Sequence, residues 1–176
     1  MNPEGQDYYR ALYEVARTVN STLQLPEVLD LAVTYTARAL GAKACSLRLL
    51  TPTREQLEIS AVYGLSEAYV AKGPVRVSGS LVDAEALDGR SVQVFDAGQD
   101  PRLQYPEEAA REGIASILVV PVIARSEAIG VLRIYTSEPH EFGHREVEFA
   151  EIIANLTGLA IENAREYGAL QEQFGA

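Results

Sequence analysis

The sequence predicts an α+β fold: a central antiparallel sheet of about six strands, with N- and C-terminal helices on one face. Helical spacing of apolar residues occupies residues 8–40 and everything after residue 145, whereas strand-like segments fill the middle. Two pairs of these segments are joined by short turns, as in β-hairpins. The 176 residues show no internal repeat or linker, so we expect one domain over residues 1–176.

The first helix is predicted over residues 8–19 and the second over residues 26–40. Pro26 suits the first helical position of the second helix, and Gly41 is a natural residue just past its end. Two strands follow, 44–51 and 56–64, with a turn at residues 52–54.

The middle of the chain is predicted to alternate short helices with strands. Short helices are expected at 65–72, 80–87 and 106–113, and strands at 74–77, 91–96, 115–123 and 127–136. The strand at 115–123 is almost continuously apolar, which indicates burial on both faces.

The last helix is predicted from Arg145 to about Phe174, with two apolar stripes. One stripe has steps of four and three, typical of a helix–helix seam: Phe149, Ile153, Leu156, Ala160 and Asn163. The other is expected to face the sheet: Val147, Ile152, Leu159 and Ile161. The first stripe, with Leu12 and Val19 of the first helix, predicts a homodimer interface. Residues 162–176 are expected to extend as a signalling and dimerisation helix, or alternatively to fray as a tail.

Composition excludes several classes of function. The formal net charge of −10 disfavours nucleic acid and anionic membrane surfaces as partners. No apolar run approaches the ~18 residues of a membrane span. The single cysteine, Cys45, can form neither an intramolecular disulfide nor a redox couple, which favours a cytoplasmic protein.

No catalytic motif is recognisable. The sequence lacks phosphate-binding glycine loops, a G-x-S-x-G elbow and an H-E-x-x-H helix. His140 and His144 lie beside Pro139 and Gly143 in a predicted loop, so we interpret them as solvated loop histidines rather than metal ligands. We therefore predict no enzyme, no metal and no cofactor.

A long polar region between residues 65 and 113 is the predicted binding region, since irregular segments over a rigid sheet usually carry binding sites. Its polar residues are Arg76, Ser78, Ser80, Asp83, Asp96, Asp100, Arg102 and Tyr105. We predict a ligand site formed by Arg76, Arg102, Tyr105 and Ser116, in which the arginines favour a small anion. In the alternative interpretation each arginine pairs with Asp96 or Asp100, and the Ser116 hydroxyl serves a backbone carbonyl.

Four segments in this order resemble a GAF domain, the small-molecule sensory module of bacterial kinases, cyclases, phosphodiesterases and transcription activators. They are LYEVARTVNSTLQLPEVLDLAVTYTARALGA, ACSLRLLTPTREQLEISAVYGL, GIASILVVPVIARSEAIGVLRIYTSEPHEF and EVEFAEIIANLTGLAIENA. The resemblance covers about residues 9–165. It implies a ligand pocket on the sheet face opposite the terminal helices, roofed by short helices and loops.

The resemblance also limits the choice of ligand. Covalent bilin attachment requires a cysteine in the roof, and residues 65–113 contain none. The enzymatic branch that reduces free methionine sulfoxide uses several cysteines. Of the cyclic-nucleotide motif only Phe142 and Glu146 match. The sequence therefore predicts a signal-input domain of a two-component or similar regulator, which couples an unidentified small molecule to an effector. The alternative is a ligand-free dimerisation module.

Overall fold

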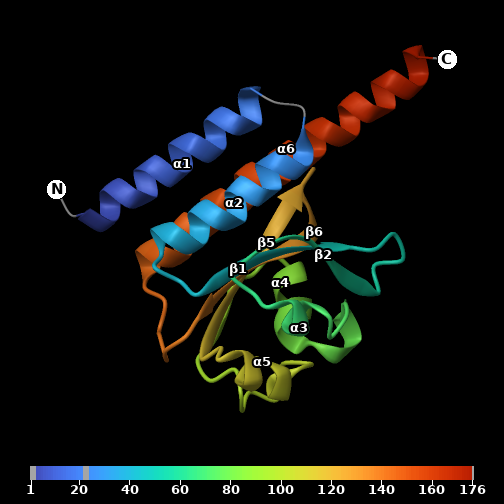
Figure 1. The fold of residues 1–176 in the computed structure, drawn as a ribbon. Coiled ribbons are helices and arrows are strands. Elements are labelled where there is room, and N and C mark those ends of the chain that lie inside the picture. The colour runs from blue at the N-terminus through green and yellow to red at the C-terminus, as the bar shows by residue number, and fades with distance from the viewer. Residues whose placement is uncertain (1–2, 22–23, 176) are drawn as a thin grey trace.

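The computed structural model describes residues 3–21 and 24–175 and confirms the predicted α+β architecture (Figure 1). In chain order the elements are α1 (Pro3–Ser21), α2 (Leu25–Ala39), β1 (Ala44–Leu50), β2 (Gln56–Tyr63), α3 (Glu67–Val70), β3 (Val75–Arg76), the 3-10 turn η1 (Val77–Gly79), α4 (Leu81–Leu87), β4 (Val92–Val94), α5 (Pro106–Glu112), β5 (Ser116–Ala124), β6 (Glu127–Thr136) and α6 (His144–Phe174). The one element that the sequence did not predict is η1. No helix among the described residues is long and apolar enough to cross a membrane.

The six strands form one antiparallel sheet in the order β3-β2-β1-β6-β5-β4. The two predicted hairpins, β1–β2 and β5–β6, lie side by side because β1 also pairs with β6. β1 and β6 are therefore the two central strands of the sheet, and Ser46 of β1 lies opposite Arg133 of β6.

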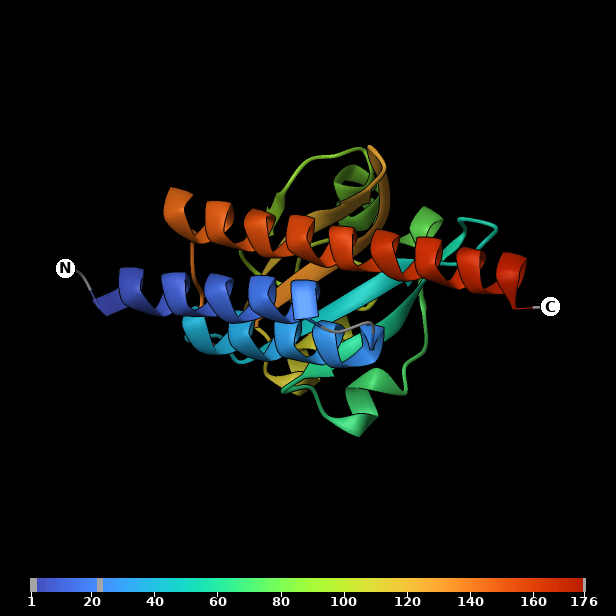
Figure 2. The same ribbon diagram turned by 90° about the horizontal axis from the view of Figure 1, so that it is seen from above.

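One face of the sheet carries the three long helices. α2 and α6 pack directly on the strands, and α1 lies over the groove between them, as the view from above shows (Figures 1 and 2). α2 ends as predicted: Gly41 takes a left-handed conformation, with φ of 60°, and the amide of Ala42 donates to the carbonyl of Ala37. Tyr8 of α1 stacks on Phe149 of α6 with ring centroids 4.6 Å apart.

The burial of α6 corrects the assignment of its two stripes. Phe149, Ile153 and Ala160 are buried in the core between helices and sheet, as is Val19 of α1. Ile152 and Leu159, which were expected to face the sheet, are instead 39% and 45% exposed. The prediction that α6 has apolar residues on two sides is confirmed. Because α6 packs on both the sheet and α1, however, the face that it buries within the chain is wide. Phe149, Ile153 and Ala160 belong to that intramolecular face, and Ile161 of the second stripe is buried with them, as expected.

α6 approaches β5 closely at Gly158. A Cβ atom at this position would lie 2.0 Å from the carbonyl oxygen of Ile123. Two backbones can come this near only where one residue has no side chain.

We expect Gly158→Ala to lower the free energy of unfolding by about 1–3 kcal/mol, since helix or strand must shift to relieve the clash. Gly168→Ala on the same helix is the control, because nothing lies within 4 Å of its added Cβ. Alanine is the better helix former, so this control should stabilise the protein by up to ~1 kcal/mol. Urea unfolding of both variants measures the difference; equal effects would contradict the close approach.

The opposite face of the sheet is covered by α3, α4, α5, η1 and their connecting loops, which we call the roof (Figure 1). A second hydrophobic cluster joins the roof to the sheet and includes Leu57, Tyr69, Val82, Ile117 and Tyr135. The molecule thus has a helical layer, a sheet and a roof, and the candidate site lies between the last two.

Candidate functional site beneath the roof

Polar side chains gather where the two central strands meet the roof. Residues alternate between faces along a strand, so Leu47 and Leu132 face the helices, while Arg48 and Arg133 face the roof. Ser46 and Tyr135 join them, with their hydroxyl oxygens 2.8 Å apart. All of these polar side chains are buried. The floor of the site is therefore polar, although it lies in the middle of the sheet.

Arg133 is paired with a carboxylate that α4 delivers from the roof. Its Nε donates to Oδ1 of Asp83 at 3.0 Å, and its Nη2 donates to Oδ2 of the same group. Ser80, the residue before α4, also donates its hydroxyl to Asp83. Burial lowers the pKa of Arg133, but the adjacent Asp83 carboxylate more than offsets this and holds the pKa above its usual value.

Arg48 has no comparable partner. Its side chain is fully buried. Neither Nε nor Nη2 has a hydrogen-bond partner among the residues that the structure describes. Leaving a buried charged donor without an acceptor costs several kcal/mol, so this arginine does not contribute to stability as an ion pair would.

Lys72, just after α3, brings a third cation to the site. Its ammonium lies 3.8 Å from the centroid of the Tyr69 ring and 5.5 Å from that of Tyr105. Burial, together with the charges of Arg48 and Arg133, lowers the pKa of Lys72 to about 7. In the described part of the chain, Nζ has no hydrogen-bond partner. Near neutral pH this amine can gain or lose a proton in response to a nearby charge.

Two neighbouring hollows give the site its shape. An outer hollow of about 470 Å³ opens between α3 and α5, and Glu108, Arg111 and Glu112 lie on the α5 side. An inner cavity of about 10 Å³ lies deeper, at Arg133, Ile117 and Leu103. Tyr69 and Lys72 line both hollows, so they separate the interior from the surface.

Three hydrogen bonds close the roof over the inner cavity. The amide of Ser66 donates to Oε2 of Glu112 at 2.8 Å, the Tyr105 hydroxyl donates to the carbonyl of Pro74 at 3.0 Å, and the amide of Arg76 donates to Oε1 of Gln104 at 2.8 Å. Each bond joins the segment around α3 and β3 to the segment around α5. Opening between these two segments would widen the inner cavity without disturbing the sheet.

The structure does not bring the four sequence-predicted ligand residues together. Tyr105 alone lines the inner cavity. The side chain of Arg76 is exposed. Arg102 forms a bidentate pair with Asp100, with Nη2 2.7 Å and Nε 3.0 Å from its oxygens, and donates to the carbonyl of Gln93. The hydrogen bond from the Arg102 guanidinium holds the pKa of the Asp100 carboxyl below its usual range. For Arg102, the alternative interpretation of an ion pair with Asp100 is therefore confirmed.

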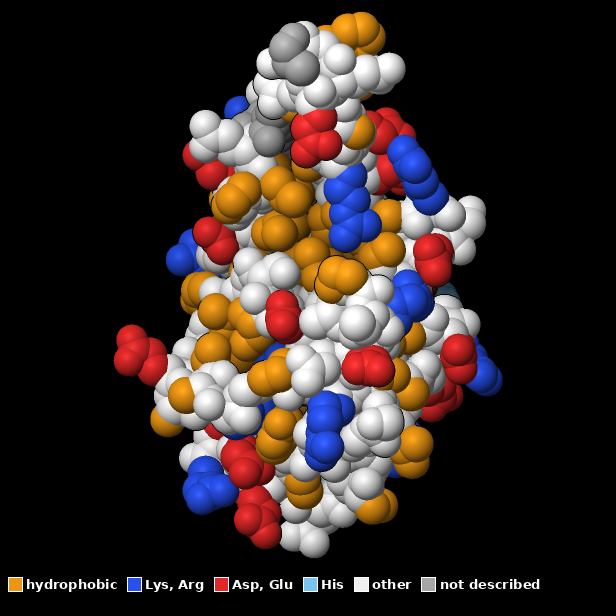
Figure 3. Space-filling view, turned by 90° about the vertical axis from the view of Figure 1, so that its right-hand side faces the viewer, with side chains coloured by type: hydrophobic (Ala, Val, Ile, Leu, Met, Phe, Trp, Pro, Cys, Tyr) orange, Lys and Arg blue, Asp and Glu red, His pale blue; other side chains and the backbone are white. Residues whose placement is uncertain are grey.

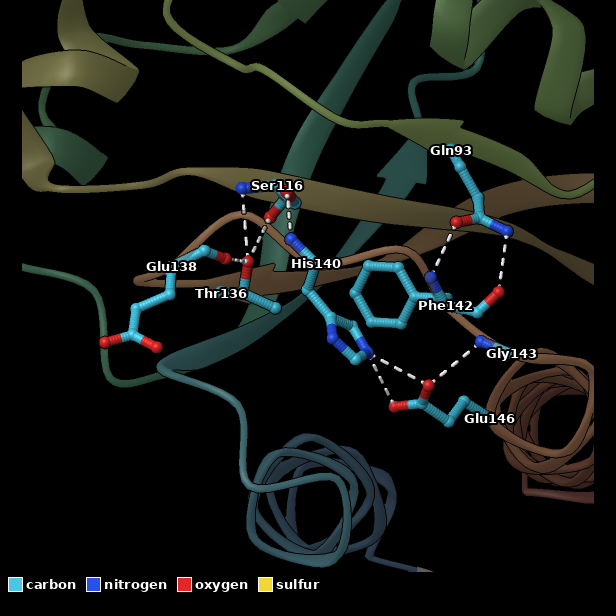
Figure 4. Close-up of polar contacts among 8 residues, drawn as sticks. All are labelled: Gln93, Ser116, Thr136, Glu138, His140, Phe142, Gly143 and Glu146. Carbon is cyan, nitrogen blue, oxygen red and sulfur yellow. Dashed lines mark hydrogen bonds and ion pairs between the residues drawn. The ribbon is translucent and has the colours of Figure 1, made fainter.

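Ser116 lies on the helix-facing side of β5, with the same parity as Leu118 and Val120. Its hydroxyl donates to the carbonyl of Phe95, just after β4, at 2.6 Å. It also accepts from the amide of His140 at 2.9 Å and so fastens the loop between β6 and α6 (Figure 4). The alternative interpretation, in which the Ser116 hydroxyl binds a backbone carbonyl, is therefore confirmed.

The same loop contains the predicted loop histidine. The imidazole Nε2 of His140 lies 2.9 and 3.0 Å from the carboxylate oxygens of Glu146, which also accepts from the amide of Gly143 (Figure 4). His144 is the first residue of α6 rather than part of the loop. Among the described residues no three His, Cys, Asp or Glu side chains gather into a group that could hold a metal ion.

Sequence analysis missed Arg48, Arg133 and Lys72. The first two interrupt otherwise apolar strands, ACSLRLL and EAIGVLRIYT. A charged residue inside a buried central strand is itself a signal, because such residues are rarely fully buried without a partner. Asp83 and Ser80 were recognised only as polar residues of the roof region.

Comparisons with known proteins agree with the architecture. A sequence model of the GAF domain matches residues 22–162. The chain is 27% identical over 174 residues to the methyl sulfide methyltransferase-associated sensor of Methanosarcina acetivorans, matching 96% of this chain and 17% of that protein. It is 29% identical over 185 residues to the circadian input-output histidine kinase CikA of Thermosynechococcus vestitus, matching 97% of this chain and 25% of that protein.

A solved structure of a GAF domain has the same fold as this chain. The GAF domain of a phosphoenolpyruvate-protein phosphotransferase from Coxiella burnetii superimposes with a TM-score of 0.82 and 26% identity, over 96% of this chain and 99% of that one. The chain spans about a quarter or less of the length of the two curated relatives, which are a sensor and a histidine kinase. From the match over residues 22–162 and the shared fold, we conclude that this chain belongs to the GAF domain family.

Proposed function

We propose that this GAF domain is a signal-input module that binds a small molecule beneath the roof and transmits binding to a dimer of its terminal helices. The observation that carries the proposal is the buried cluster of Arg48, Arg133 and Lys72, in which Arg133 alone forms an ion pair, with Asp83, among the described residues. A roof region that served packing alone would be filled by apolar side chains. One relative is described as a sensor and the other as a circadian input-output histidine kinase, and both descriptions are consistent with a signalling role for this domain.

Dimerisation is proposed through the outer helix surface, which we define as the exposed apolar residues Tyr9, Tyr13, Ile152 and Leu159. Tyr9 and Tyr13 lie one turn apart on α1, and Ile152 and Leu159 lie two turns apart on α6. The two helices run side by side above the sheet (Figure 2). Half-buried Leu12 and Leu156, together with exposed Asn163, add to this surface. Several exposed apolar side chains on adjacent helices are typical of a protein–protein interface.

The end of α6 continues the proposed interface. Tyr167, Leu170 and Phe174 are exposed on its last three turns. Figure 3 shows hydrophobic side chains gathered below this projecting end, where grooves lie on both sides of Leu170. Arg125 of the β5–β6 hairpin contacts Glu162 and Glu166 and so ties the start of this segment to the sheet. We propose that residues 162–174 carry the signal to the effector.

We expect Leu159→Glu to shift the dimer to monomer, weakening association at least ~100-fold, because an unpaired charge buried in an apolar interface costs several kcal/mol. Leu159 is largely exposed in the single chain, so folding should be unaffected. Sedimentation over a dilution series measures the change. Gln99→Glu adds the same charge at an exposed position in the loop after β4, on the opposite side of the sheet from the helices, and is the control. A wild-type chain that is monomeric throughout would refute the dimer.

A library of small metabolites of differing charge tests the sensory role through their effect on the melting temperature. Compounds that stabilise the protein are then added to Glu172→Cys carrying a spin label, since Cys45 is buried and does not compete for the label. We expect such a compound to change the distance between the two labels of a dimer. A ligand that leaves the distance unchanged would argue against coupling. Absence of any ligand, with the dimer intact, would favour the alternative of a ligand-free dimerisation module.

A further inference from the structure

The donor atoms of Arg48 match those of an arginine that already holds a carboxylate. Arg133 uses Nε and Nη2, on one edge of its guanidinium, to bind both oxygens of Asp83. Arg102 binds Asp100 through the same two atoms. In Arg48 these same two nitrogens lack an acceptor in the described part of the chain. Two parallel N–H groups on a planar group are the geometry that fits a carboxylate.

A second donor without an acceptor lies close to the first. The charges of Arg48 and Arg133 both act on the Lys72 ammonium, and Nζ is buried without a hydrogen-bond partner within the described ranges. Both groups lie beneath the same roof, beside Tyr69 and Tyr135, whose rings meet edge to face at 6.2 Å. Three cations share this space with Asp83, and Asp83 is fully engaged by Arg133 and Ser80.

We propose that the space beneath the roof, widened from the inner cavity towards the buried side chain of Arg48, binds the carboxylate group of a small organic acid, held side-on by Nε and Nη2 of Arg48 with the Lys72 ammonium as the second donor. The inference rests on the proposed sensory function and specifies the class of its ligand. The organic part of the acid points towards Tyr69, Tyr105 and the outer hollow between α3 and α5. The roof bonds of Ser66 and Tyr105 open to admit it.

A carboxylate fits this site better than a phosphate does. The adjacent fork, on Arg133, is already filled by a carboxylate in the same surroundings. The inner cavity of about 10 Å³ has room for about one water molecule, so either group enters only after the roof opens, and a planar carboxylate needs less widening than a tetrahedral phosphate. The cavity wall is partly apolar, with Val75, Leu103 and Ile117 beside Gln104 and Tyr105. Planar oxygens at the end of an apolar or aromatic group match this mixture of donors and rings.

Binding is also expected to depend on pH through Lys72. The groups that face it are Tyr69 of α3, Tyr105, Arg48 of β1, Arg133 of β6, Asp83 of α4 and Glu108 of α5. A bound anion raises the pKa of Lys72 from about 7, so binding takes up a proton above that pH. Affinity is therefore greatest below pH 7 and falls as pH rises, because a carboxylic acid stays ionised over this range.

The test uses acetate, propionate and benzoate, their neutral amides, and inorganic phosphate, titrated into the intact chain by calorimetry. We expect at least one acid to bind at least about tenfold more tightly than its amide and than phosphate. Arg48→Met should abolish that binding, and Arg90→Met, at an exposed arginine, should not. Lys72→Met should weaken binding and remove its dependence on pH. In NMR spectra of arginine side chains, the Nε–H signal of Arg48 should shift on binding.

Equal affinity for acid and amide, tighter binding of phosphate, or unchanged binding by Arg48→Met would each overturn the inference. So would failure of all three acids to bind. These results are distinguishable from failure of the proposed function. If the metabolite library yields a ligand of another class that changes the spin-label distance, the sensory function stands and only the carboxylate is excluded. If no compound binds at all, both the sensory function and the carboxylate site are excluded.

Discussion

Replacing Asp83 by asparagine should cause the largest loss of stability of any single change considered. The substitution keeps the shape of the side chain but removes its charge, so that buried Arg133 loses its only ion-pair partner among the described residues. Breaking a buried pair in this way costs about 3–5 kcal/mol. For a chain of this size the melting temperature should fall by roughly 6–20 °C. Urea unfolding monitored by circular dichroism measures the loss.

Asp100→Asn is the matched control, because Asp100 also forms a bidentate pair with an arginine, but near the surface. Exposed pairs are worth about 0–1 kcal/mol, so its effect should be small. Replacing both partners, as in Asp83→Leu with Arg133→Met, should recover most of the stability because no charge is left buried alone. If Asp83→Asn were as mild as Asp100→Asn, the pair would not anchor α4 to the sheet.

Arg48→Met should have the opposite effect. Methionine has a similar length and fills the same space without a charge, and Arg48 is fully buried with two donors lacking acceptors among the described residues. Removing such a charge should raise the free energy of unfolding by about 1–4 kcal/mol. The gain should appear without any added ligand, as a higher melting temperature and a higher urea midpoint.

Arg90→Met, at an exposed position, should change stability by less than ~0.5 kcal/mol. A gain in stability combined with loss of carboxylate binding would identify Arg48 as a residue kept for binding at the expense of stability. Destabilisation by Arg48→Met would show instead that the guanidinium supports the fold.

Much of the fold was predictable because its signals are local. The change from helical spacing to strand alternation near residue 44 and the turns at residues 52–54 and 124–126 define the elements, and the hairpins define an antiparallel sheet. The pairing of β1 with β6 joins segments more than eighty residues apart, and no local signal in the sequence indicates it.

The candidate site was less predictable, for a physical reason. Whether an arginine binds a ligand depends on whether another part of the chain already satisfies it. Arg102 has Asp100 two residues away, and this local pairing could be anticipated. Arg133 is satisfied by Asp83, fifty residues earlier, whereas Nε and Nη2 of Arg48 have no acceptor among the described residues, and strand spacing does not distinguish these two cases. Ile152 and Leu159 of α6 were assigned to the wrong face for a similar reason, since spacing shows that two faces exist but not which neighbour covers each.

The edge of the sheet at β4 explains why self-association would use helices. Open edge strands invite pairing with another chain, but β4 has only three residues and β3 only two. The side-chain amide of Gln93 binds both the N–H and the carbonyl of Phe142 and so holds the loop before α6 against the helix-facing side of β4 (Figure 4). Arg102 donates to the carbonyl of Gln93 itself. An arginine first considered for ligand binding therefore helps to cap the sheet against addition of a foreign strand, and so protects the domain from aggregation.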